Sequence, residues 1–163
     1  MADSDSENLR AGDVAWKLIK PCRYSQDLSP EPLKFIDDFV RLPQAIGHLI
    51  AVQWCDSEVC NGGFHQFFGN STGIFAPEAA EGNRAIGLVP IADLIEHCMS
   101  LLGEPFPRDR GVRNDRLDQL SHYERKSREE WDPFHELDDR YYDLMRELRH
   151  QEAWGKFASA NQG

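Results

Sequence analysis

Residues Trp54–Gly73, WCDSEVCNGGFHQFFGNSTG, decide the fold of this 163-residue chain. Glycine loses more backbone freedom on folding than any other residue, so the pair Gly62-Gly63 is costly inside a helix. The stretch therefore predicts a helix that ends near Cys60, a turn at residues 61–63 and a second short helix. Three phenylalanines of that second helix have i, i+3, i+4 spacing and share one face: Phe64, Phe67 and Phe68.

Helical patterns continue on both sides of this corner. Before it, a helix from Pro43 to about Val59 is apolar on more than one side, which predicts a central and largely buried helix. After it, Pro90 opens the clearest amphipathic helix, whose apolar residues recur at the 3.6-residue period and which ends at Gly103. No alternation of apolar and polar residues exceeds four positions, so the predicted class is all-α.

Other boundaries follow from proline and from short polar stretches. Pro21 is expected to stop a first helix that spans residues 10–20. Residues 29–31, Ser-Pro-Glu, have the cap, proline and acidic first turn of a helix start. Residues 104–114 are expected to form the longest irregular connection.

Length and composition favour one soluble domain. A chain of this size is normally a single domain, so we expect residues 1–8 to be disordered and residues 9–163 to form one compact multi-helix domain. No apolar run reaches the roughly 18 residues of a membrane span, and the acidic N-terminus is not a signal peptide. The four cysteines are dispersed, which favours reduced thiols in a cytoplasmic protein.

The charge is strongly negative and unevenly distributed. The formal net charge is −10. Residues 24–107 contain eleven acids and three bases, whereas residues 108–163 contain thirteen acids and eleven bases. Direct binding to nucleic acid or to anionic lipid requires a basic face, so the charge argues against both and permits a basic protein partner.

Pairs of carboxylates are predicted on the outer faces of three helices. Side chains three or four residues apart on a helix lie about 5–6 Å apart at Cβ, which is comparable to the spacing of phosphates along DNA. Such rows could stand in for a phosphate backbone on a rigid helical frame. The candidate partner-binding residues are Asp37, Asp38, Glu78, Glu81, Asp93 and Glu96.

The polar side chains of the corner have two interpretations. In the structural one, Glu58, Gln66 and Asn70 satisfy backbone groups left unpaired where the helix breaks. In the functional one, these residues and His65 line a ligand-binding or catalytic pocket beside the turn, where a carboxylate next to aromatic rings acts as acid or base. The residue pattern favours the structural interpretation.

Metal, cofactor and thiol chemistry are not supported by the spacing. Cys55, Cys60 and His65 are five residues apart, and an i, i+5 spacing on a helix does not converge on one zinc ion. A buried Cys60 beside His65 and Asp56 would have a raised thiol pKa, the opposite of what a nucleophile needs. No glycine-rich phosphate loop follows a strand. We therefore expect no metal, no cofactor and no catalytic residue.

The corner carries a longer motif, E-x-x-N-G-G-F-x-Q-F-F-x-N-x-x-G, which resembles the bacterial DNA-mimic-protein-like family. The motif residues are Glu58, Asn61, Gly62, Gly63, Phe64, Gln66, Phe67, Phe68, Asn70 and Gly73. The similarity extends over roughly residues 33–157 and includes the closing pattern LDDRYYDLM.

The resemblance implies an all-helical, acidic and dimeric protein. In that family the characterised DNA mimic occupies the DNA-binding surface of a transcription factor and relieves repression. The arginine-rich segment 108–128 departs from a uniformly acidic surface. Two alternatives therefore remain beside a non-enzymatic DNA mimic: a pocket beside Gly62-Gly63, and a toxin-neutralising, immunity-type protein.

Overall fold

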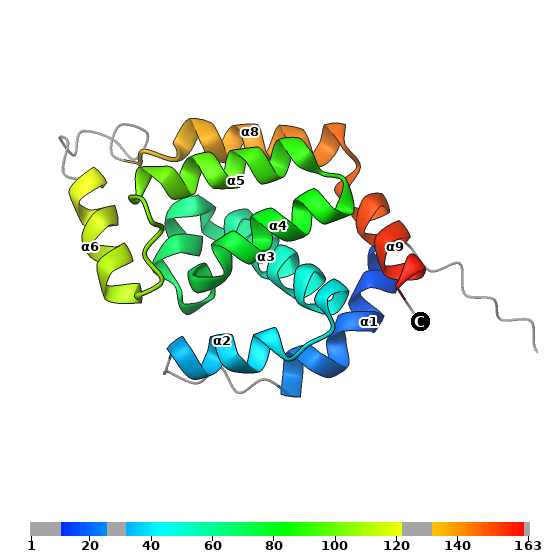
Figure 1. The fold of residues 1–163 in the computed structure, drawn as a ribbon. Helices are drawn as coiled ribbons and strands as arrows, with labels where there is room; N and C mark the ends of the chain where they lie inside the picture. The colour runs from blue at the N-terminus through cyan, green and yellow to red at the C-terminus, as the bar shows by residue number, and fades with distance from the viewer. Residues whose placement is uncertain (1–10, 26–31, 122–131, 162–163) are drawn as a thin grey trace, which may run out of the picture.

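The computed structural model describes residues 11–25, 32–121 and 132–161, and within these ranges all regular secondary structure is helical (Figure 1). This confirms the predicted all-α class. The predicted disordered segment 1–8 lies outside the described residues. The helices are α1 (Ala11–Ser25), α2 (Pro32–Val40), α3 (Gln44–Gly69), η1 (Ser71–Phe75, a 3-10 turn), α4 (Ala76–Ile86), α5 (Val89–Leu101), α6 (Arg110–Ser121), α8 (His135–Glu147) and α9 (His150–Ala160).

Helix α3 is the central element, as the sequence predicted. It packs against α1, α2, α4, α6, α8 and α9 and against η1. Its side chains from Leu49 to Val52 are consecutive and all buried, so every face of the helix is covered at this level. An apolar helix on more than one side can be stable only in such a position, because exposed apolar surface costs free energy.

The helices after α3 pack one upon another around it. Helix α4 packs on α3, α5 packs on α4, and α8 lies beside α5 along the top of the molecule (Figure 1). Helix α6 closes one end, while α1 and α9 pack together at the other end (Figure 1). The amphipathic stripe of α5 faces inward as predicted, with Ile91, Ile95 and Cys98 buried.

Two predicted boundaries are wrong. Helix α1 continues through Pro21 to Ser25, because its packing against α9, with Ala15 and Ile19 buried, supports it beyond the proline. The irregular connection is shorter than predicted, since α6 already begins at Arg110. There the carboxylate of Asp109 accepts the Val112 N–H at 2.9 Å, a side-chain cap that the sequence contains. The helix start predicted at residues 29–31 lies outside the described ranges.

Among the helices that the structure describes, none is long and apolar enough to cross a lipid bilayer.

Candidate functional site

The predicted corner is present, and it consists of a break within α3. Gly62 has φ −159° and ψ 23°, and Gly63 has φ 75° and ψ −179°, so neither is helical. The conformation of Gly63 is open essentially only to glycine, and a Cβ at this position would overlap the Asp138 carboxylate. The break therefore requires glycine for two separate reasons, one in the backbone and one in the packing.

The phenylalanines after the break form the aromatic wedge of the core. Phe64, Phe67 and Phe68 are completely buried. Phe68 lies 5.9 Å from Phe64 and 5.4 Å from Phe67 between ring centroids, and Phe134 packs on Phe68 at 5.5 Å. Gly73 of η1 lies directly against the same helix, where a Cβ would overlap the Phe67 carbonyl oxygen.

Glu58 is the centre of a polar cluster across the break. Its Oε2 accepts hydrogen bonds from Gln66 Nε2 at 2.6 Å and Asn70 Nδ2 at 2.8 Å, and its Oε1 accepts one from Thr72 Oγ1 at 3.1 Å. Asn61 Nδ2 donates to Gln66 Oε1 at 3.1 Å. The side chains thus bond to one another, whereas the structural interpretation had assigned them to backbone groups.

The backbone groups at the break are satisfied from distant parts of the chain. Asp138 of α8 accepts the Phe64 N–H at 2.8 Å and so caps the start of the second helical half. At the other end, Arg110 Nε donates to the Gly69 carbonyl at 2.8 Å and Arg113 Nε to the Phe68 carbonyl at 2.8 Å. A carboxylate at the start of a helix and guanidinium groups at its end both stabilise the helix dipole.

Burial shifts the pKa of both capping side chains. Burial raises the pKa of Asp138 to about 6, although the hydrogen bond from Phe64 opposes the shift. Burial lowers the pKa of Arg113 to about 10, and the neighbouring Arg110 adds to this effect. Burial removes water from both charged groups, which costs free energy. It results from the close packing of α6 and α8 on the corner.

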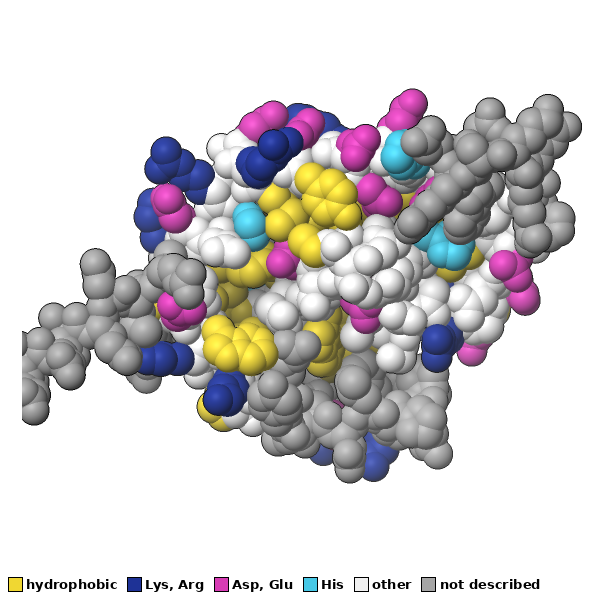
Figure 2. Space-filling view, turned by 180° about the vertical axis from the view of Figure 1, so that it is seen from behind, with side chains coloured by type: hydrophobic (Ala, Val, Ile, Leu, Met, Phe, Trp, Pro, Cys, Tyr) yellow, Lys and Arg dark blue, Asp and Glu magenta, His cyan; other side chains and the backbone are white. Residues whose placement is uncertain are grey.

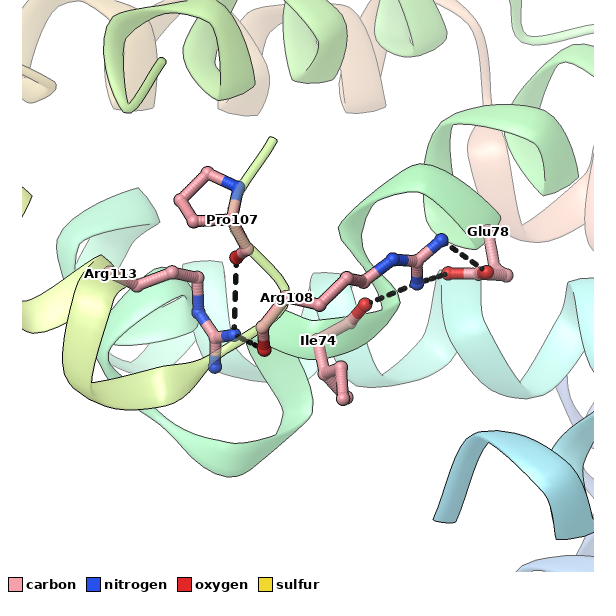
Figure 3. A network of polar contacts seen from close by, with 5 residues as sticks. All are labelled: Ile74, Glu78, Pro107, Arg108 and Arg113. Carbon is pink, nitrogen blue, oxygen red and sulfur yellow. Dashed lines mark hydrogen bonds and ion pairs between the residues drawn. The ribbon is translucent and has the colours of Figure 1, made fainter. Parts of the chain in front are cut away.

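Arg113 is the largest fully buried side chain in the described part of the chain, with no exposed surface. In addition to Phe68, it donates to the carbonyl oxygen of Asn70 at 3.0 Å. It also donates to the carbonyl oxygens of Pro107 at 3.5 Å and of Arg108 (Figure 3). The sequence had placed Arg113 in an arginine-rich segment without a defined role. Its role is to bind backbone carbonyl groups around the loop before α6.

Arg108 points the other way, toward α4 (Figure 3). It forms two hydrogen bonds with the Glu78 carboxylate, at 2.7 and 2.9 Å, and a third with the Ile74 carbonyl at 2.6 Å. A two-point arginine–carboxylate pair is the strong form of this interaction. Glu78, one of the six candidate partner-binding acids, is therefore engaged within the protein.

The other candidate acids lie in two separate places. Asp93 and Glu96 of α5 both bind Arg84 of α4, at 2.9 and 2.8 Å, and the exposed Glu81 also lies on α4. Asp37 and Asp38 lie on α2, which Figure 1 places on the opposite side of α4 from α5. The structure thus brings the α4 and α5 acids together but separates them from those of α2.

A longer carboxylate row, which was not among the predicted sites, lies on α8. Four acids with i, i+3, i+7, i+11 spacing share one side of this helix: Glu136, Asp139, Asp143 and Glu147. Arg140 pairs with Glu147 at 3.4 Å and Arg146 pairs with Asp143. The spacing was visible in the sequence, but the arginines between these acids made the segment look like an ordinary solvated helix face.

The cysteines of α3 are poor nucleophiles. The Cys60 thiol donates to the Asp56 carboxylate at 3.7 Å, and burial together with this carboxylate raises the pKa of Cys60 to about 11. Burial also raises the pKa of Cys55 well above its ordinary value. A search of the described residues finds no group of three histidine, cysteine or acidic side chains that could hold a metal ion.

Comparison with known proteins identifies a family. A family model described as DMP19-like protein matches residues 40–161, which include the corner motif, η1 and the described helices α3–α6, α8 and α9. No curated protein and no solved structure matches the chain.

Proposed function

The chain belongs to the DMP19-like protein family, the DNA-mimic family that its corner motif resembles, and on this premise we propose that it is a DNA mimic. In this proposal the protein acts in the cytoplasm without catalysing a reaction. It presents carboxylates to the DNA-binding surface of a basic protein, such as a transcription factor, and does so as a homodimer.

The observation that carries the proposal is the pair of acidic helices α5 and α8, which pack side by side. Asp93 and Glu96 on α5 and Asp143 and Glu147 on α8 have side chains that are 49–62% exposed. At 1.5 Å per residue, the row on α8 is about 16 Å long. It therefore places its carboxylates at intervals of the same order as phosphates on one DNA strand.

Three arginines of segment 108–128 bind groups near the corner rather than the acids of α5 and α8. Arg113 is fully buried, Arg108 binds Glu78 and a carbonyl group, and Arg110 binds the end of α3. Three bases of the arginine-rich segment thus contribute to holding the corner together. The remaining bases of that segment include Arg125, Lys126 and Arg128, which lie outside the described residues.

The pocket alternative is less well supported. The oxygens of Glu58 are occupied by Gln66, Asn70 and Thr72, so a ligand would have to displace bonds that already exist. His65 is half-buried on the same helix. An immunity-type protein would use the same acidic surface as a DNA mimic and differs from it only in its partner.

The test is competition with DNA. The immobilised protein is incubated with native cytosol, and bound proteins are eluted with duplex DNA and with increasing salt. We expect a DNA-binding protein to be released by both, because it uses one basic surface for both partners. A partner that stays bound in excess DNA contradicts the proposal, and one that binds no DNA supports an immunity-type role instead.

A charge-matched pair of variants locates the surface. Glu136→Gln with Asp139→Asn removes two carboxylates from α8 that form no ion pair with another described residue. The control, Asp115→Asn with Glu152→Gln, removes two exposed carboxylates from α6 and α9. We expect the α8 variant to bind about fivefold more weakly and the control to bind like the wild type. Equal weakening of both variants would show that only the total charge matters.

A further inference from the structure

A cavity of about 340 Å³ is lined by residues of α1, α3 and α9. Its volume is at the lower end of the range for small-molecule sites. On the back of the molecule, hydrophobic side chains gather in and around a hollow, next to acidic and histidine side chains (Figure 2). The residues of the lining that carry the chemistry are Asp13, Trp16, Gln53, Asp56 and Trp154.

The lining is acidic and aromatic. Among the described residues, it includes the carboxylates of Asp13 and Asp56 but no lysine or arginine. It also includes two tryptophans, Trp16 from α1 and Trp154 from α9. Aromatic faces attract cations through the ring quadrupole, most strongly for tryptophan, and the attraction grows when the cation is desolvated. Carboxylates and indole rings in one cavity therefore favour the same class of ligand.

The polar groups of the cavity are incompletely satisfied. Among the described residues, the buried acceptor Oε1 of Gln53 has no donor. Most buried polar atoms in proteins are hydrogen-bonded, so this oxygen points to a missing donor. Trp154 is only 8% exposed, and its Nε1–H also has no partner among these residues, but as a donor it needs an acceptor and not a cation.

Asp56 is the most demanding of these groups. It lies at the inner side of the cavity, where the Tyr141 hydroxyl donates to it at 3.5 Å and the Cys60 thiol at 3.7 Å, both long contacts. Burial raises the pKa of Asp56, although the nearby His150 opposes the shift. No lysine or arginine in the described ranges forms an ion pair with this carboxylate. A cation that enters the cavity would supply a positive partner for the Asp56 carboxylate.

We propose that this cavity binds an organic cation, with an ammonium or guanidinium group held between Asp56 and the indole rings of Trp16 and Trp154. The proposal does not rest on DNA mimicry, because none of the candidate partner-binding acids lines the cavity. The cation belongs either to a free small amine or to a basic side chain of a bound protein.

The test is calorimetric titration of the full chain with agmatine, which carries both cationic groups. 1-Pentanol is the neutral comparator, and acetyl-Gly-Arg-Gly-amide represents a protein side chain. We expect agmatine to bind with one-to-one stoichiometry at millimolar affinity or better, and 1-pentanol not to bind. Tighter binding of agmatine than of the peptide identifies a free amine as the ligand, whereas the reverse identifies a side chain.

Variants connect the binding to the cavity. Asp56→Asn and Asp13→Asn are each expected to weaken agmatine binding about tenfold or more. Asp115→Asn on α6 makes the same change in net charge and should leave binding unchanged. Two carboxylate variants keep the test valid if Asp56→Asn fails to fold, which far-ultraviolet circular dichroism would reveal. The proposal is overturned if neither cation binds at millimolar concentration, if 1-pentanol binds equally well, or if Asp115→Asn weakens binding as much as the cavity variants.

Discussion

Replacing Gly63 with alanine should destabilise the protein through both the backbone and the packing of the corner. The backbone of Gly63, at φ 75° and ψ −179°, lies in a region that is essentially restricted to glycine. The added Cβ would also overlap the Asp138 carboxylate that accepts the Phe64 N–H. The substitution therefore strains the chain and displaces the cap at the same time.

The two effects can be given magnitudes. A residue held in a forbidden backbone region costs about 1–3 kcal/mol. Loss of a hydrogen bond to a charged group costs about 1.5–3 kcal/mol. Together they predict a loss of about 2.5–6 kcal/mol, which is a large fraction of the stability of an ordinary domain. For a chain of this size, the melting temperature should fall by roughly 5–24 °C.

Urea unfolding followed by circular dichroism measures the loss, and Gly87→Ala is the matched control. Gly87 ends α4 at φ 93°, but a Cβ there would meet nothing within 4 Å, so only backbone strain of about 1–2 kcal/mol is expected. In an Asp138→Ala background, Gly63→Ala should cost less, because the clash and the cap are already gone. If Gly63→Ala costs no more than Gly87→Ala, then the contact with Asp138 does not stabilise the break.

Three further predictions concern the side chains around the corner. Burial raises the pKa of Asp138 from its ordinary 3.8 to about 6 in the folded protein, so the folded state binds the proton more tightly than the unfolded state. As pH falls from about 7 to 4, the wild type should therefore gain stability relative to Asp138→Asn. Parallel curves of unfolding free energy against pH, measured by urea unfolding, would contradict this. Arg113→Lys should lower the free energy of unfolding by about 2–4 kcal/mol in the same assay, because one ammonium group cannot replace a guanidinium that binds four carbonyl groups. The control is the exposed Arg116→Lys, and a smaller loss for Arg113→Lys than for this control would refute the prediction. Glu58→Gln should lower the free energy of unfolding by about 1.5–3 kcal/mol, because it replaces a carboxylate that accepts three hydrogen bonds with an amide that carries its own donor. Unchanged stability would show that the polar cluster around Glu58 contributes nothing.

The local features of the corner could be predicted from the sequence, because their physical causes are local. Two adjacent glycines in an apolar helix are enough to predict a break. The i, i+3, i+4 spacing of the phenylalanines is enough to predict a buried wedge. The position of Glu58 one helical turn before the break predicted that it would bind there, but the prediction named backbone groups, whereas its partners are side chains.

The partners of the corner could not be predicted, because they come from distant positions. Asp138 lies 74 residues from the N–H that it caps. Arg113 lies 45 residues from the Phe68 carbonyl that it binds, and the segment around it is rich in charge, which usually indicates exposure. Local patterns do not show which of several arginines is buried, since that depends on how the loop before α6 folds over α3. For the same reason the sequence did not show that Arg84 joins Asp93 to Glu96.

DNA mimicry makes one electrostatic demand that can be measured directly. For a partner eluted by duplex DNA, the logarithm of its affinity for this protein should fall linearly with the logarithm of salt concentration, as its affinity for DNA does. The Glu136→Gln, Asp139→Asn variant should show a shallower slope than the Asp115→Asn, Glu152→Gln control. An affinity for this protein that does not change with salt, while the same partner's affinity for DNA falls steeply, would contradict the proposed function.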